Sequence, residues 1–308
     1  MKIVLTGSIG NIGKPLTGIL VKNRHDVKVI TSKKERVAQI EALGAKAAIG
    51  RMEDADFLAA SFSGADIVYC METMESAGGL LDSDIDIFSA INIIGNSYRK
   101  AIETCNIKRV VHLSSVGAHT NKGIGILEFH YNVEQILRQL PEDVSIKTIR
   151  PVGFYSNLFS HFRTISAYSS IISNYGGDTK EPWVSTTDIA EVIAEEIEKP
   201  FDGRTVRYIA SDEVSPNEIA KSLGQAIGIP DLQWKIISDK EMIDGLLATG
   251  MNLQAAKGFT EMQAGPGNGP IYEDYNKNIP VLRKIKLKDL QMNLQSNTIN
   301  TNNNEYNK

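Results

Sequence analysis

The chain has 308 residues, of which 42% are hydrophobic and 23% are charged, and its formal net charge is -4. This balance is typical of a globular protein with a sizeable core, built as one large domain with a smaller lobe or as two domains that share an interface. The small negative charge provides no basic field for nucleic acid or an anionic membrane. We therefore expect neither nucleic acid nor a membrane as a partner, and expect a small molecule instead.

The cysteines and the apolar runs indicate the compartment. Cys70 lies in an apolar strand-like run and Cys105 lies near a helix end, which suits buried thiols in a reducing compartment and does not support a metal site. The apolar run at 3–5 is too short for a signal-peptide core, and no stretch approaches the roughly 20 apolar residues of a membrane span. We expect a cytoplasmic protein.

Strand-like runs alternate with segments of helical apolar spacing through the first half of the chain. Strands are expected at 2–6, 26–31, 45–50, 65–71, 108–115 and 144–151, and helices at 12–23, 36–44, 54–64, 86–105 and 124–140. This alternation predicts an α/β fold, a Rossmann-type doubly wound parallel sheet with helices on both faces.

The rhythm changes after Pro151, where we expect a smaller C-terminal α/β lobe. The pattern predicts helices at 157–172 and 185–200 and a late strand at 205–211. The expected division is a first domain over 1–153, to which parts of 182–210 return, and a smaller lobe over 154–290 with a turn-rich segment at 264–270. A disordered Asn-rich tail is expected over 291–308.

A glycine-rich segment joins the first strand to the first helix. In such a loop one glycine allows a tight turn, one lets the backbone approach a pyrophosphate, and one lets the helix pack on the strand. The helix N-terminus then offers N–H groups and a partial positive charge to phosphate. The alternative is a turn that is merely glycine-rich. The expected cofactor contacts here are Gly7, Ser8, Ile9, Gly10, Asn11, Ile12 and Gly13.

Several motifs in order resemble a known family. They are TGSIGNIG, KRVVHLSSVGAH, IKTIRPVGFYSNL, and STTDIAEVIAEEI followed by SPNEIAKSLGQAIG. Over residues 1–290 the chain resembles the NmrA-like branch of the atypical short-chain dehydrogenases/reductases, and is most similar to its NAD(P)H quinone reductase-like members. The resemblance implies a Rossmann domain with a small substrate lobe and NADP(H) as the cofactor.

The residues after the second strand bear on the choice between NADP(H) and NAD(H). No acid stands at the strand end, whereas Lys33, Lys34 and Arg36 can reach a 2′-phosphate and Ser32 can donate a hydroxyl hydrogen bond. This favours NADP(H) over NAD(H). The alternative is the solvated cationic start of a surface helix. Arg51 stands where relatives tend to have an aspartate near the adenine.

The Tyr-x-x-x-Lys pair of standard short-chain dehydrogenases is missing. In the family register HYNVE places His130 at the lysine position and Glu134 at a glutamate, and leaves Ile126 where the tyrosine would be. A neutral imidazole can hydrogen-bond a ribose hydroxyl, and a protonated one can supply a proton. The alternative for His130 is a satisfied, structurally buried histidine, the role that we assign to His112 and His161.

Further candidates lie at the strand ends. Ser114 and Ser115 end the fifth strand, where either corresponds to the active-site serine of the superfamily or is a turn residue. The loop 71–84 and the residues after the sixth strand are expected to enclose the nicotinamide. The candidates are Ser115 and His130 as catalytic residues, Met71, Thr73, His130, Pro151 and Phe154 as cofactor contacts, and Tyr155, Asn157 and Gly78 as substrate contacts.

Loss of the tyrosine acid matters least for an acceptor whose reduction gives a stable anion. We therefore expect an enzyme, an NADPH-dependent reductase of quinones or similar conjugated electrophiles that acts as a monomer or homodimer. One alternative is an NmrA-like redox sensor that binds NADP(H) without turnover and signals to a protein partner. Another is a nucleotide-sugar epimerase or dehydratase, although those chemistries depend on the Tyr-Lys pair.

Overall fold

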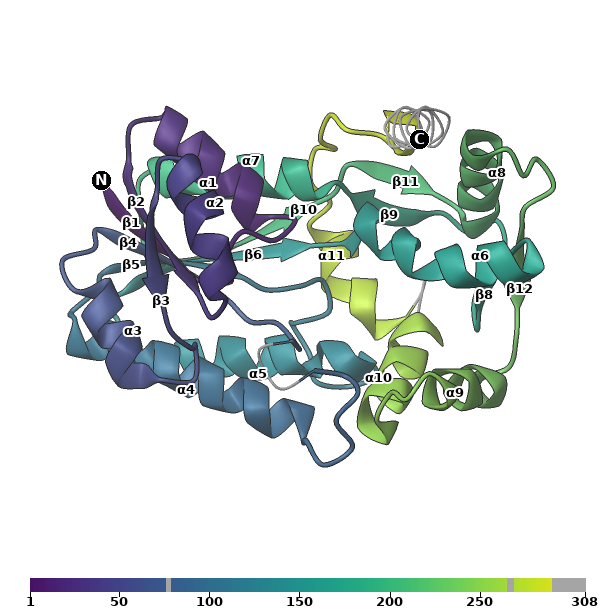
Figure 1. Ribbon diagram of the computed structural model, residues 1–308, viewed down its shortest axis with the longest axis horizontal. Coiled ribbons are helices and arrows are strands. Elements are labelled where there is room, and N and C mark those ends of the chain that lie inside the picture. The colour runs from purple at the N-terminus through teal and green to yellow at the C-terminus, as the bar shows by residue number, and fades with distance from the viewer. Residues whose placement is uncertain (76–78, 265–268, 290–308) are drawn as a thin grey trace.

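Seven parallel strands form the central sheet of the computed structural model, which describes residues 1–75, 79–264 and 269–289 (Figure 1). The expected tail at 291–308 lies outside the described residues, as does most of the turn-rich segment 264–270. In spatial order the strands are β10 (Arg204–Ile209), β6 (Ser145–Pro151), β5 (Arg109–Leu113), β4 (Ile67–Met71), β1 (Lys2–Leu5), β2 (Asp26–Thr31) and β3 (Lys46–Ile49). This order is that of a doubly wound dinucleotide-binding sheet, so the predicted fold class is confirmed.

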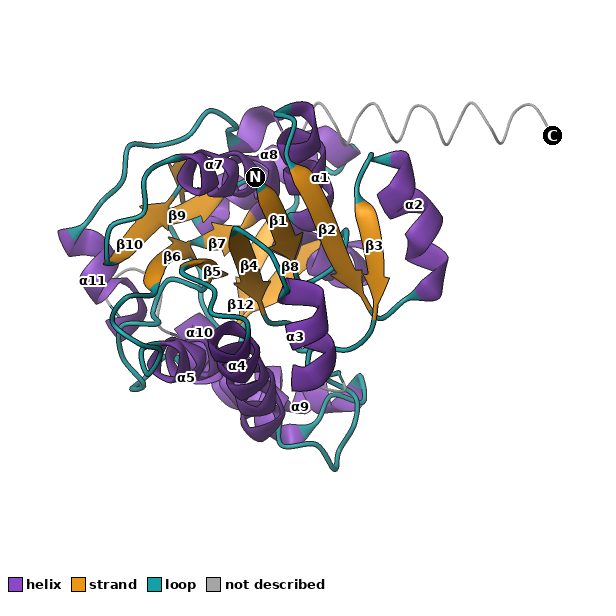
Figure 2. Cartoon of the chain, turned by 90° about the vertical axis from the view of Figure 1, so that its left-hand side faces the viewer, coloured by secondary structure: helices purple, strands orange, loops and turns teal. Residues whose placement is uncertain are grey.

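Helices cover both faces of this sheet (Figure 2). One face packs against α1 (Gly13–Lys22), α2 (Val37–Ala42) and α7 (Thr186–Glu198). The other packs against α3 (Ala55–Phe62), α4 (Ile87–Thr104) and α5 (Glu128–Leu137). Alternate residues of each strand therefore enter different cores: Val111 packs with α1 and α7, whereas Val110 packs with α4 and α5.

Polar side chains fix where several helices begin. The hydroxyl of Ser185 accepts from the N–H of Thr187 at the start of α7. At α8 (Pro216–Ile227) the side chains of Ser215 and Glu218 each accept from the other's backbone N–H, which is a capping box. The first of these positions agrees with the helix start predicted at 185.

The C-terminal lobe contains two small sheets. The first consists of β7 (Gly153–Phe154), β9 (Glu181–Val184) and β11 (Asp212–Val214), and the second of β8 (Ser170–Ser173) and β12 (Gln233–Ile236). The remaining elements are η1 (Lys34–Arg36), η2 (Gly125–Leu127), η3 (Tyr155–His161), α6 (Phe162–Tyr168), α9 (Asp239–Ala248), α10 (Leu253–Ala264), η4 (Pro270–Tyr272) and α11 (Glu273–Lys277).

The single helix predicted at 157–172 is wrong over its last residues. η3 and α6 occupy 155–168, and then Ser169 adopts a left-handed conformation with φ 47° that ends the helix. Ile171 follows in β8, where it pairs with Trp234 of β12. The partner strand lies far along the chain, so local apolar spacing did not indicate it.

Two distant segments return to the first domain. β10 pairs in parallel with β6 and forms the edge of the central sheet. Ala255 of α10 lies in the core beside α4, and the side-chain oxygen of Gln254 accepts from the N–H of Ile87 at 2.7 Å. The chain thus passes between the two parts more than once.

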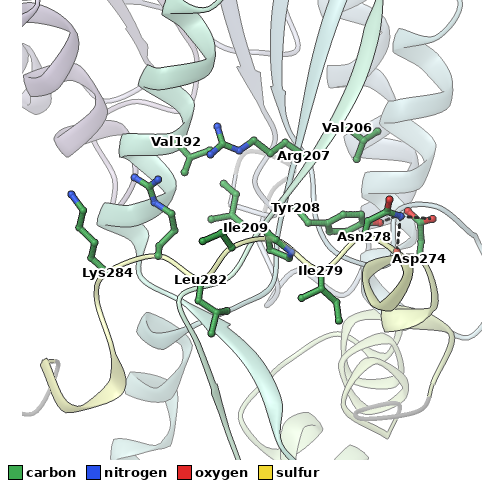
Figure 3. A pocket seen from close by; sticks show the side chains of 13 residues that line it. Val192, Val206, Arg207, Tyr208, Ile209, Asp274, Asn278, Ile279, Leu282 and Lys284 are labelled. Atoms are coloured by element: carbon green, nitrogen blue, oxygen red, sulfur yellow. Dashed lines mark hydrogen bonds between the residues drawn. The ribbon is translucent and has the colours of Figure 1, made fainter.

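A groove of about 670 Å³ lies outside β10, beneath the segment 278–284 (Figure 3). Val192 of α7 and Tyr208 of β10 are among its lining residues. The strands β6, β5 and β4 separate this edge from β1, so the groove is distinct from the glycine loop. Within the described ranges no helix has the length and apolar character that crossing a membrane requires.

Candidate active site

In the glycine loop after β1, packing excludes a side chain at two of the glycines and leaves space for one at the third. Gly7 has φ 83°, and a Cβ there would lie 2.0 Å from the sulfur of Met71. A Cβ on Gly13 would lie 2.0 Å from the carbonyl oxygen of Ser8. A Cβ on Gly10 would have no atom within 4 Å. Gly7 and Gly13 therefore serve the fold, and Gly10 provides the open surface that a close backbone approach to a pyrophosphate requires.

Ser8 ties this loop to the neighbouring strand. Its N–H donates to the carbonyl of Ile30 at 3.0 Å, and its hydroxyl donates to Thr31 at 2.9 Å. The residue is buried and has a left-handed φ of 62°. At Ile12, where α1 begins, no side chain caps the helix. In the first turn of α1 the N–H groups of Lys14 and Leu16 donate to the carbonyls of Gly10 and Ile12 at 3.0 Å, and Pro15 has no N–H. The part that fits a dinucleotide pyrophosphate is therefore the loop around Gly10.

The cationic segment after β2 carries a partner that the sequence did not indicate. Lys33 Nζ lies 2.6 Å from the carboxylate of Glu75, in the loop after β4. The hydrogen bond and charge of Lys33, with a smaller contribution from Arg36, lower the pKa of Glu75. Ser32 and Lys34 are exposed. Among the predicted phosphate-binding cations, Lys33 is therefore already paired with a carboxylate from the loop after β4.

His130 meets a buried carboxylate. It projects from α5, and its Nδ1 lies 3.0 Å from Oε1 of Glu72, the residue that directly follows β4. On the other side of Glu72, Nε2 of His112 lies 3.2 Å from each carboxylate oxygen. The side chains of Glu72 and His112 are 0% exposed and that of His130 is 14% exposed. The three residues form a cluster at the carboxyl end of β4, beside the point where the strand order reverses.

Charge stabilises this cluster. Burial alone would raise the pKa of Glu72, but the charge and hydrogen bond of His112 and the hydrogen bond of His130 outweigh it and lower the pKa to about 2. For His112, burial acts to lower the pKa, and the charge of Glu72 outweighs it and raises the pKa. Glu72 is therefore an ionised carboxylate at neutral pH, held by two imidazoles.

A second buried network lies beside the first. Ser114 donates its hydroxyl hydrogen to Oε1 of Glu134 at 2.6 Å, and Arg150 holds both oxygens of Glu134. Arg150 also donates to the hydroxyl of Tyr208 and to Asp274. Ser114 is thus committed to structure, whereas Ser115, the predicted active-site serine, is partly exposed at the same strand end.

The other predicted contacts lie at the same edge of the sheet. Met71 ends β4, and its carbonyl accepts from the hydroxyl of Tyr98. Pro151 ends β6, and its carbonyl accepts from the N–H of Val116 at 2.9 Å. Thr73 follows β4 two residues later. These predicted cofactor contacts therefore lie together at the carboxyl ends of the parallel strands.

The residues predicted to contact the acceptor begin the lobe. Phe154 is partly buried in β7, and Asn157 is exposed in η3. Tyr155 is 3% exposed and stacks on Trp183 with the ring centroids 6.3 Å apart, an arrangement that also packs the lobe. Gly78 lies outside the described residues.

Glu72 and Arg150 were not among the residues predicted from the sequence, and His112 was predicted to be structural alone. A signal was present for each. Glu72 directly follows a buried strand, the position at which parallel sheets present ligand-binding groups. His112 and Arg150 interrupt apolar strands, and a polar residue in a buried strand requires a partner.

The parallel sheet, its glycine loop and the cationic segment after β2 define a Rossmann-type fold of the NAD(P)-binding kind. The chain belongs to the NmrA-like family, whose model matches residues 1–280.

Similar proteins include several reductases. The NAD(P)H azoreductase of Xenophilus azovorans is 20% identical over 263 residues, which cover 85% of this chain and 86% of that protein. An NADPH-dependent quinone oxidoreductase from Escherichia coli, solved with NADPH, has a TM-score of 0.76 at 17% identity. The match covers 95% of this chain and 99% of the oxidoreductase chain. A Citrobacter triphenylmethane reductase, solved with NADP(H), has a TM-score of 0.70 at 16% identity. The match covers 94% of this chain and 99% of the reductase chain. These likenesses establish the fold.

Proposed function

We propose that this protein is an NADPH-dependent reductase that transfers a hydride to a quinone or a similarly conjugated electrophile. The observation that carries the proposal is the His130–Glu72 pair, 3.0 Å apart, at the carboxyl end of the strand beside β1 and its glycine loop. The reductases named above, which span most of the chain, support the reaction class.

The chain would hold the dinucleotide along the carboxyl edge of the sheet. The backbone around Gly10 and the start of α1 would bind the pyrophosphate, and Ser32, Lys33 and Arg36 would bind the 2′-phosphate. Met71, Thr73, Pro151 and Phe154 would enclose the nicotinamide end. When bound, the cofactor supplies the hydride. The remaining expected loop contacts are Gly7, Ser8, Ile9, Asn11, Ile12 and Gly13.

His130 and Ser115 would act at the reacting end. His130 would hydrogen-bond a ribose hydroxyl and so fix the position of the ring that gives up the hydride. Hydride addition to a quinone gives an oxygen anion that is stable enough for water or a weak donor such as Ser115 to protonate. Reduction of an isolated ketone would require a stronger acid, so the absence of a tyrosine at position 126 favours quinones.

The acceptor would lie where the lobe meets the sheet. Phe154 offers an aromatic ring for stacking on a flat molecule, and Asn157 offers an amide for its oxygens. Tyr155, held against Trp183, would position this segment.

A single-turnover experiment tests the proposal. Purified protein is mixed with stoichiometric NADPH, a panel of quinones and enals is added, and the absorbance of the reduced nicotinamide is followed, with NADH in parallel. We expect saturable oxidation of NADPH by a quinone. If NADPH binds tightly but no acceptor oxidises it faster than the protein-free control, the proposal is overturned in favour of a regulator that senses the cofactor.

A further inference from the structure

We propose that Glu72 and His112 are positioning residues for His130: together they hold its imidazole in the tautomer with the proton on Nδ1 and present Nε2 as a hydrogen-bond acceptor. The tautomer follows from contacts within the chain. That Nε2 meets a ribose hydroxyl of the dinucleotide rests on the proposed function.

The hydrogen-bonding roles at Glu72 allow one assignment. An ionised carboxylate accepts hydrogen bonds and donates none. Because Nδ1 of His130 lies 3.0 Å from Oε1 of Glu72, this nitrogen must carry the hydrogen. By the same argument Nε2 of His112, which is 3.2 Å from both oxygens, carries a hydrogen as well. The carboxylate thus selects one nitrogen of each ring.

His112 keeps the carboxylate in this orientation. It projects from β5, the strand that pairs with β4, and its N–H is shared by both oxygens of Glu72. Its positive form compensates the buried negative charge of Glu72, which would otherwise be very unfavourable in this place. With this charge supplied by His112, the contribution of His130 to the carboxylate is the hydrogen bond from its Nδ1.

The consequence concerns the direction of the hydrogen bond at Nε2. When Nδ1 carries the only proton, Nε2 presents a lone pair and accepts. A lysine at position 130, which the family register would place there, can only donate. Ribose hydroxyls would therefore donate to His130, and among the described residues Nε2 has no hydrogen-bond partner that competes for this role.

The chain contains an internal reference with the opposite tautomer. Nε2 of His25 lies 3.0 Å from a carboxylate oxygen of Glu198, so this ring carries its proton on Nε2. On the other side, Nδ1 of His25 lies 3.5 Å from the terminal ammonium of Met1, which donates to it. In the same sample, His25 should therefore carry its proton on Nε2 and His130 on Nδ1.

Nuclear magnetic resonance of ¹⁵N-histidine-labelled protein tests the tautomer, with signals assigned through His130→Asn and His25→Asn. We expect His130 to show a protonated Nδ1 and an unprotonated Nε2, and His25 the reverse. Glu72→Gln keeps an acceptor oxygen and should keep the His130 pattern, whereas Glu72→Ala should lose it. Glu198→Gln is the matched control and should leave His130 unchanged. A wild-type spectrum with the His130 proton on Nε2 overturns the proposal, even if Glu72→Ala does not fold.

Calorimetric titration with NADPH tests the coupling without turnover. His130→Ala and Glu72→Ala should each weaken binding by about tenfold, and the double variant should be no weaker, because both act through one hydrogen bond. Additive losses would overturn the positioning role. If NADPH does not bind while His130 has the expected tautomer, the proposed function fails and the positioning role stands. If a quinone oxidises NADPH while His130 carries its proton on Nε2, the positioning role fails alone.

Discussion

Arg150 grips Glu134 with two parallel hydrogen bonds, from Nε to Oε1 at 2.9 Å and from Nη2 to Oε2 at 2.7 Å. Both side chains are 3% exposed. The pair joins β6 to α5, the helix that carries His130, and thereby fixes the height of that helix over the sheet.

Replacing Arg150 should strongly destabilise the protein. Arg150→Met leaves the charge of Glu134 buried, and among the described residues its remaining ion-pair partner is Arg138, 3.9 Å away at the solvent side. We expect a loss of about 3–5 kcal/mol in the free energy of unfolding, measured by urea denaturation.

Arg207 provides the matched control for this substitution. It is one-third exposed and pairs with Glu195 and Glu196, and Glu196 keeps Lys147 and Lys199 as partners when Arg207 is removed. Arg207→Met should therefore cost no more than about 1 kcal/mol. Equal losses for the two variants would contradict the importance of burial here.

Gly10→Ala should separate binding from folding. The new methyl group has no neighbour within 4 Å, so the thermal midpoint of unfolding should hardly change. The methyl would, however, stand where the pyrophosphate approaches, and we expect NADPH binding to weaken by about tenfold or more. Gly18→Ala is the control, since its methyl is also unobstructed but lies further along α1. If both variants bind NADPH like the wild type, Gly10 is not a cofactor contact.

Glu75→Gln should favour NADPH over NADH. The carboxylate of Glu75 neutralises Lys33 and would repel a 2′-phosphate, so its removal frees one cation for the phosphate. Since the ion pair is exposed, we expect NADPH to bind only a few-fold more tightly, with NADH unchanged. Calorimetry with both cofactors measures this, and Glu103→Gln controls for net charge. An equal gain for NADH would show that Glu75 does not sense the phosphate.

Glu181 should make stability fall with rising pH. Burial raises the pKa of this carboxyl group to about 8. The native state therefore keeps a proton that the unfolded chain releases near its ordinary pKa of 4.5, and the stability due to this proton is complete below that pH and lost as the pH approaches 8.

The Glu181→Gln variant tests this directly. The wild type should lose about 2 kcal/mol relative to the variant between pH 6 and pH 8. Urea denaturation of both proteins at each pH gives the difference. A difference independent of pH would mean that Glu181 is already ionised at pH 6.

Patterns local in sequence predicted the parts of the fold that depend on local interactions. The strand expected at 26–31 is β2, and the helix expected from 185 begins as α7 where Ser185 caps it. The strand β8 was missed because Ile171 extends only by pairing with Trp234. Strand pairing across such a separation leaves no periodic signal.

The candidate site divides in the same way. Gly10 and His130 could be selected as candidates from the sequence because a short motif and a helix register contain them. Glu72 was missed because its importance comes from two histidines on other elements, at positions 112 and 130, that fold onto it. Glu75 was missed for the same reason, since only the assembled sheet brings it to Lys33.

The position of β10 has a consequence for synthesis on the ribosome. β6 ends at Pro151, but the strand that pairs with it begins at Arg204. Translation proceeds at about 5–20 residues per second, so roughly three to ten seconds pass between synthesis of the end of β6 and synthesis of β10, which completes the sheet. During that interval the unpaired backbone edge of β6 can form hydrogen bonds with other chains. Tyr208, to which Arg150 donates a hydrogen bond in the folded protein, has not yet been synthesised. We expect newly made chains to require protection from aggregation at this stage, and polypeptides that end before residue 204 to be insoluble.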